Sequence, residues 1–168
     1  MLVKSGAISD DPYIRLKDDE ALPAQAVIVS LKRFLGDKDL LLAHDLPLGV
    51  LLESSESPEA LEESLHQLAL VVLNVPYFRD GRAFSWARML RTRLKFKGEI
   101  RVTGHVLRDQ IAFFVRVGVD AFELQQNLSL DDFNAALNEI TNVYQPSVDK
   151  RATILDLREC SGAVRSGR

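Results

Sequence analysis

The sequence predicts an α/β fold: a single domain with about five mainly parallel strands that alternate with helices, preceded by a short N-terminal extension. Two observations predict it. Short runs rich in aliphatic and β-branched residues recur along the chain, at 26–30, 48–53, 68–75, 99–103 and 120–124. Segments with the helical spacing of apolar residues lie between these runs, as a strand followed by a crossover helix requires.

The predicted strands are too few to close a complete barrel, so we expect an open sheet or a partial barrel. A second copy could cover the exposed face or edge of such a sheet, which makes a homodimer one expectation. With 168 residues, 46% of them apolar, the chain has the size of one domain with a substantial core.

Three regions are expected in order along the chain. Residues 1–22 carry polar turns and short apolar pieces, which are typical of a hairpin or edge extension that packs on the domain. Residues 23–146 form the α/β domain, and Pro146 closes its last helix. Residues 147–168 are a polar tail with one apolar island, ATILDL, and the alternatives are a flexible segment or one that docks on a neighbour.

The predicted helices have readable start signals. Ser30, Ser57 (followed by Pro58), Asp80 and Ser129 each precede a segment with helical spacing. In the segment after Asp80, Phe84, Ala87 and Leu94 follow the spacing of a buried stripe. The basic residues of this third helix are therefore expected to face solvent or a site.

Composition excludes several classes of protein. The apolar runs are far shorter than the roughly 20 residues that cross a bilayer, and no signal-peptide core is present, so we expect a cytoplasmic protein without membrane association. The single cysteine, Cys160, allows no paired-thiol site, and the scattered His44, His66 and His105 predict no metal centre. Neither a phosphate loop nor a dinucleotide fingerprint occurs, so no cofactor can be inferred.

Ligands of open parallel sheets bind beyond the carboxyl ends of the strands. Two such ends place an arginine, Arg82 or Arg108, in the first turn of a helix, where a cation opposes the helix dipole unless an anion binds. We therefore predict an oxyanion site formed by Arg82, Arg108, Gly81, Ser85, Thr103 and Gly104. Surface ion pairs are the alternative for both arginines.

Three residues near the same strand ends could move a proton, namely Asp109, His105 and Glu123. His105 is equally well a turn residue, and Asp80 is read as a helix cap rather than as an acid. Glu53 also falls at a strand end beside Asp80 and Glu123, but any fold of this kind places some acids there, so no magnesium site is inferred.

Eight Lys or Arg but only two acids lie between residues 79 and 101, whereas the whole chain has a formal net charge of −3. We expect Arg88, Arg91, Lys95 and Lys97 to form a surface for an acidic protein partner, with a solvated helix face as the alternative. Nucleic acid is not expected, because the chain is acidic overall and the basic run lacks interleaved aromatic residues on a strand surface.

Three ungapped stretches resemble one bacterial family. They are FRDGRAFSWARMLR from Phe78, FKGEIRVTGHVLRDQ from Phe96 and GVDAFEL from Gly118. The chain is similar over these stretches to the family called domain of unknown function 934, and more weakly from about residue 2 to residue 145. The most regular positions of the family correspond here to Asp80, Gly81, Arg82, Ser85, Arg88, Gly98, Thr103, Gly104, Leu107, Arg108, Asp109, Gln110, Asp120 and Glu123.

The resemblance implies a place in bacterial sulfur assimilation, since members are encoded beside assimilatory sulfite reductase and often carry the label of a sulfite-reduction oxidoreductase. Two functions follow from it. The first is an accessory or oxyanion-binding protein of the sulfite-reducing system, with sulfite reductase or another sulfur-assimilation protein as partner. The second is a small enzyme with an arginine-lined oxyanion site. Relatives commonly have Asp where this chain has His105, and often Cys where it has Val117, so chemistry that needs that carboxylate or thiol is not expected here.

Overall fold

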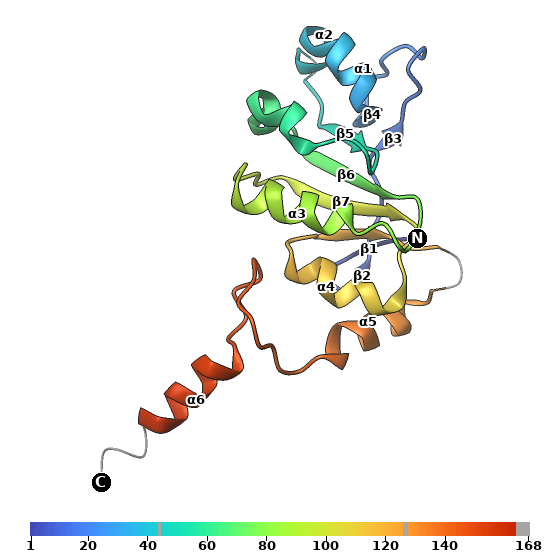
Figure 1. The fold of residues 1–168 in the computed structure, drawn as a ribbon. Coiled ribbons are helices and arrows are strands. Elements are labelled where there is room, and N and C mark those ends of the chain that lie inside the picture. The colour runs from blue at the N-terminus through green and yellow to red at the C-terminus, as the bar shows by residue number, and fades with distance from the viewer. Residues whose placement is uncertain (44, 126–127, 164–168) are drawn as a thin grey trace.

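The computed structural model describes residues 1–43, 45–125 and 128–163, and its centre is one curled sheet (Figure 1). The described strands are β1 (Leu2–Lys4), β2 (Ala7–Ile8), β3 (Ile14–Arg15), β4 (Val27–Ser30), β5 (Leu48–Leu52), β6 (Leu70–Val75), β7 (Glu99–Gly104) and β8 (Ala121–Glu123). They lie in the order β2-β1-β8-β7-β6-β5-β4-β3. Neighbours from β3 to β8 pair in parallel, whereas β1 runs antiparallel to both β2 and β8.

The predicted α/β class is confirmed, and the open sheet forms a half-barrel. The expected strand content is wrong, because the described sheet has eight strands rather than about five and is mixed rather than mainly parallel. The five apolar runs became β4 to β8. The strands β1, β2 and β3 have only two or three residues each, too few to show a period, and pairing with neighbours is what makes them strands.

The described helices are α1 (Leu31–Gly36), α2 (Lys38–Leu42), the 3₁₀ segment η1 (Pro58–Gln67), α3 (Arg82–Thr92), the 3₁₀ turn η2 (Arg108–Gln110), α4 (Ile111–Arg116), α5 (Leu130–Glu139) and α6 (Ile154–Ala163). Four of them, α1, η1, α3 and α5, begin close to the predicted signals. The hydroxyls of Ser30, Ser57 and Ser129 cap α1, η1 and α5 as predicted. Before α3 the cap residue is Gly81, and the Asp80 carboxylate accepts the N–H of Arg82.

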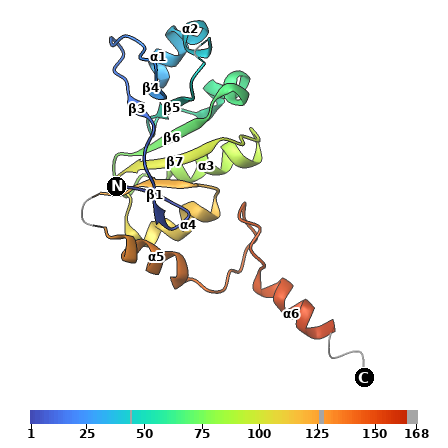
Figure 2. The ribbon, with the colours of Figure 1, turned by 180° about the vertical axis from the view of Figure 1, so that it is seen from behind.

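The helices cover one face of the sheet. The strands β4 to β8 follow one another in space as in sequence, and right-handed crossovers then place every connecting helix on the same side. Figures 1 and 2 show these helices on one face and the N-terminal segment on the other. We call the second face the open face. No helix in the described part of the chain is long and apolar enough to span a membrane.

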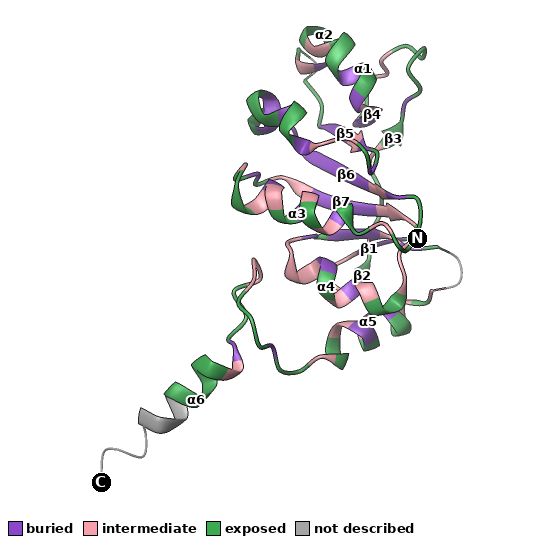
Figure 3. Cartoon of the chain, in the orientation of Figure 1, coloured by how far each residue is buried: buried purple, intermediate pink, exposed green. Residues whose placement is uncertain are grey.

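The central strands are buried on both faces (Figure 3). On β6, Val71 and Leu73 belong to the main core under the helices, whereas Leu70 and Val72 belong to a small apolar cluster on the open face. The alternation follows from the two-residue period of a strand. Leu70 and Val72 are buried because the N-terminal segment crosses above them, and Tyr13 packs against this cluster.

The N-terminal segment joins the two sides of the sheet. Its β1 pairs with β8, and its β3 pairs with β4, so the chain between them must cross the open face. We call residues 9–15 the strap. At the other end of the chain, α6 projects away from the sheet in both views (Figures 1 and 2).

Candidate functional site

A hollow of about 670 Å³ lies at the carboxyl ends of β6 and β7, and we call it the β6/β7 hollow. Its lining residues are Tyr77, Phe78, Arg79, Asp80, Gly81 and His105. The Arg79 guanidinium lies 5.3 Å from the centre of the Phe78 ring, and the His105 ring meets the same ring edge-on with centres 5.9 Å apart. The hollow therefore combines aromatic surface with a cation and an imidazole at the place where α/β sheets bind ligands.

Gly104 positions His105 at this hollow. Its φ is +93°, a conformation that favours glycine, and a Cβ there would lie 2.4 Å from the Val75 carbonyl oxygen. The same carbonyl accepts the His105 N–H at 2.7 Å. The Gln125 side chain donates to the Gly104 carbonyl at 3.0 Å. The turn after β7 is thus held by both neighbouring strand ends.

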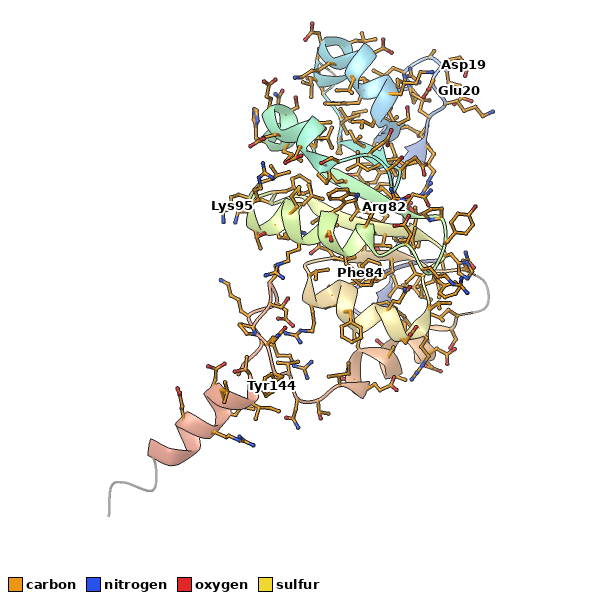
Figure 4. The ribbon with its side chains drawn as sticks, in the orientation of Figure 1. Asp19, Glu20, Arg82, Phe84, Lys95 and Tyr144 are labelled. Carbon is orange, nitrogen blue, oxygen red and sulfur yellow. The ribbon has the colours of Figure 1, made fainter. Side chains whose placement is uncertain are left out.

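Arg82 stands at the start of α3 (Figure 4), and its guanidinium is hydrogen-bonded to other residues of the chain. Its Nη2 and Nε donate to the two Asp80 oxygens at 2.7 and 2.9 Å, and Nη2 also reaches the Ser54 hydroxyl at 3.0 Å. Hydrogen bonds from Arg82 and Ser54 hold the pKa of Asp80 well below its usual range. Asp80 is therefore a permanent carboxylate near neutral pH.

The two predicted anion-binding arginines face different partners. Arg108 donates to Glu139 of α5 at 2.9 Å, whereas Arg82 pairs with Asp80. In this conformation the structure shows the ion pairs that were the alternative, and it does not bring the two guanidiniums together. The other predicted residues spread around them: Gly81 lines the hollow, Gly104 forms the turn, Ser85 and Asp109 are exposed, and Thr103 faces the open face.

The open face carries a second charged group of residues, centred on Arg101. Its Nη1 donates to Asp11 of the strap at 2.7 Å and to Glu123 at 3.2 Å, and its Nε donates to Glu99 at 3.0 Å. Burial opposes the charge of Arg101, but its bonds to Asp11 and Glu99 outweigh burial and raise the pKa of the guanidinium. Arg101 is therefore a buried cation that the strap and the sheet together neutralise.

Glu123, predicted as a proton carrier, belongs to this open-face group rather than to the β6/β7 hollow. It accepts hydrogen bonds from Thr103 at 2.7 Å and from Arg15 of the strap at 2.5 Å. Burial acts to raise the pKa of Glu123, and the bonds from Arg15 and Thr103 outweigh it, so the net shift is downward. A carboxyl with a lowered pKa is a poor general acid at neutral pH.

Sequence reasoning missed the role of Arg101, which it counted only within the basic run. A signal was present in β7, where Glu99, Arg101 and Thr103 alternate with apolar residues. That period of two puts all three side chains on one face of the strand. A charged residue in the middle of such a strand requires partners. Glu99 is a local one, but Asp11 and Glu123 lie far along the chain.

The described residues form no metal-binding group. No cluster of three or more His, Cys, Asp or Glu side chains suitable for a metal ion occurs among them. Glu53 accepts a hydrogen bond from Asn74 at 2.6 Å, Asp80 pairs with Arg82, and Glu123 lies on the open face, so each strand-end acid has its own protein partner.

The predicted partner surface divides into two parts. Arg88, Lys95 and Lys97 are exposed, and Lys95 lies beyond the end of α3 opposite Arg82 (Figure 4). Arg91 turns inward, where its guanidinium donates to the carbonyl oxygens of Phe96, Gly98 and Gly118. Gly118 lies in the turn just before β8. Arg91 thus holds two loops together in this structure, and the other three residues remain available at the surface.

The comparison with known families gives one match. The family described as a bacterial protein of unknown function, DUF934, matches residues 49–155. This chain belongs to the DUF934 family. The matched range contains the β6/β7 hollow, Arg101 and Glu123, whereas the strap precedes it. A search of curated proteins finds no match for the chain.

Proposed function

We propose that this DUF934 protein binds a small oxyanion in the β6/β7 hollow and acts as an accessory of the sulfite-reducing system. The observation that carries the proposal is the hollow itself, whose volume is in the range of small-molecule sites and which opens at the carboxyl ends of two adjacent parallel strands. The family resemblance supports sulfite as the first anion to test.

The residues that line the hollow favour binding over catalysis. Asp80 is committed to Arg82 and stays ionised, so it neither donates nor accepts a proton near neutral pH. Arg79 contacts Phe78 through the aromatic face and leaves its N–H groups for a ligand. An oxyanion beside Arg79 and His105 would meet a guanidinium fork and a ring N–H together.

The proposal is tested by calorimetric titration of the purified protein with sulfite, sulfate and phosphate. We expect Arg79→Ala to weaken binding of the best anion by about tenfold, the loss of one charge-assisted hydrogen bond. Arg93→Ala is the matched control, since Arg93 is exposed and pairs with Glu59 away from the hollow. The absence of heat with all three anions would refute the oxyanion site.

The same titration decides the two-arginine site that the sequence predicts. An anion bound through Arg82 would compete with Asp80, and an anion bound through Arg108 would compete with Glu139. If Arg82→Ala and Arg108→Ala both lose affinity for the anion while Arg79→Ala keeps it, the anion binds at Arg82 and Arg108 and not in the β6/β7 hollow.

The accessory role requires a protein partner, and the exposed Arg88, Lys95 and Lys97 support an acidic one. Purified sulfite reductase should associate with the protein at low salt and dissociate at moderate salt, because exposed ion pairs are screened. Replacing the three residues by Glu should abolish the association. Finding none at low salt with the unaltered protein would contradict the accessory role.

A small enzyme is the second candidate, and the position of His105 in the hollow supports it. In that case His105→Gln should abolish turnover of sulfite with an added electron donor, although glutamine keeps an N–H that can still hold the anion. Flavin or iron bands in the visible spectrum of the purified protein would also favour the enzyme.

A further inference from the structure

Arg101 lies under the strap on the open face, and its side chain is 0% exposed. A guanidinium in such a place must be matched by negative charge, because an unpaired buried charge is strongly unfavourable. The β6/β7 hollow does not include Arg101, so whatever matches its charge is separate from the site proposed above.

Of the three carboxylates that contact Arg101, only one has no other cation as its partner in the described structure. Glu99 also pairs with Lys4 at 2.6 Å, and Glu123 also pairs with Arg15 at 2.5 Å. Each glutamate thus has a cation of its own besides Arg101. The remaining acid is Asp11, which the strap carries to Arg101 from ninety residues away in the sequence.

Asp11 fills this position incompletely. One carboxylate oxygen accepts from Arg101 Nη1 at 2.7 Å, and the other accepts from the Tyr13 N–H at 3.2 Å. Arg101 Nη2 is buried and has no hydrogen-bond partner among the described residues. A carboxylate or oxyanion that is free of the chain can offer two oxygens to both arms of a guanidinium. The orphaned Nη2 is the observation that indicates such a ligand.

The strap is attached so that Asp11 can leave. Its backbone hydrogen bonds to the rest of the described chain lie at its ends, where Ser9 donates to Leu2 and Ile14 donates to Ala26. Pro12 has no N–H, and the Asp11 side chain is 34% exposed. Movement of the middle of the strap therefore breaks no strand pairing.

We propose that Arg101 is an anion-binding residue whose site Asp11 fills as a tethered carboxylate, and that a small carboxylate or oxyanion enters by displacing the strap. The ligand class is an anion that presents two oxygens to one guanidinium. With a monoanion such as formate the charge around Arg101 is unchanged by the exchange, since one carboxylate replaces another. The proposal is independent of the oxyanion site in the β6/β7 hollow.

The test is chemical rescue of Asp11→Ala, followed by thermal unfolding. The variant should unfold at a lower temperature than the unaltered protein, and formate, acetate or sulfite should restore the lost Tm in a saturable manner. Chloride at the same ionic strength should not. The variant should bind formate about tenfold more tightly than the unaltered protein does, because no internal carboxylate competes. Should Asp11→Ala fail to fold, Asp11→Asn keeps the side-chain volume and the bond to Tyr13, and the same anion response is expected of it.

Asp10→Ala is the matched control, an adjacent exposed acid on the same strap, and it should neither lower Tm nor respond to formate. In the unaltered protein, formate or sulfite should increase hydrogen exchange at the amides of Asp10, Asp11 and Tyr13 without changing exchange in β6. The anion site would be overturned if formate raised the Tm of Asp11→Ala and Asp10→Ala equally, or if chloride raised the Tm of Asp11→Ala as well as formate does. If formate rescues the Tm of Asp11→Ala but does not change hydrogen exchange of the strap in the unaltered protein, the idea that the anion displaces the strap is overturned. The same formate response of the strap is expected in Arg79→Ala. It distinguishes the Arg101 site from the β6/β7 hollow, whose anion binding this variant should weaken.

Discussion

Replacing Arg91 by Met should destabilise this protein, because the Arg91 guanidinium connects the chain after α3 with the turn before β8. It donates to the carbonyl oxygens of Phe96, Gly98 and Gly118 at 2.8, 2.9 and 3.0 Å, and it pairs with Asp120. The side chain is only 14% exposed, so water would replace these bonds poorly.

The magnitude follows from those bonds. Three hydrogen bonds, each taken at the net value of about 1 kcal/mol for an ordinary protein hydrogen bond, give about 3 kcal/mol. For a chain of this size that corresponds to a fall in Tm of roughly 6 to 12 °C. Arg91→Lys should lose most of it, since one ammonium cannot match the geometry of the planar guanidinium.

The assay is urea and thermal unfolding followed by circular dichroism and by the fluorescence of Trp86, the single tryptophan of the chain. Arg88→Ala, an exposed arginine on the same helix, is the control and should change Tm by less than about 2 °C. If Arg91→Met is as stable as the unaltered protein but loses an acidic partner, Arg91 is a docking residue and the structural reasoning is refuted.

Three further outcomes are expected. Arg101→Met should cost about 3 kcal/mol in urea unfolding, because it leaves Asp11 without its cation, and adding Asp11→Asn should recover part of the loss; no recovery would show that the pair is not what the mutation breaks. Gly104→Ala should cost more than about 1 kcal/mol, since φ is +93° and the new Cβ meets the Val75 carbonyl; equal stability would disprove that contact. The pKa of Glu123 is lowered in the folded state, so its contribution is complete above the ordinary glutamate pKa and is lost as pH falls below it. Glu123→Gln should therefore flatten the acid limb of a Tm-against-pH curve, and an unchanged limb would contradict the shift.

Much of the fold could be predicted because its central elements are local in origin. The runs that became β4 to β8 are long enough to show their apolar character, and Ser30, Ser57 and Ser129 cap helices through bonds that span two or three residues. The strands β1 to β3 were beyond such reasoning, since two or three residues carry no period and their partners lie far along the chain.

The candidate site was predicted in its location more than in its contacts. His105 and Gly81 do lie together at the carboxyl ends of β6 and β7. The partners of Arg82 and Arg108 could not be foreseen, because a long side chain reaches several residues and the choice among nearby carboxylates depends on how α3, η2 and α5 pack. Family membership and the sulfur context are different matters: the DUF934 match shows the first, and the second stays a prediction.

The sequence by itself determined which segments form the central strands and where their helices begin, because apolar periodicity and capping are properties of neighbouring residues. Only the tertiary structure decided what Arg101 does. Its alternation with apolar residues placed it on one face of β7, but the face became a buried one because β1 pairs with β8 and β3 pairs with β4. That pairing draws the strap across the sheet and sets Asp11 against Arg101 from ninety residues away, a contact that no local pattern contains.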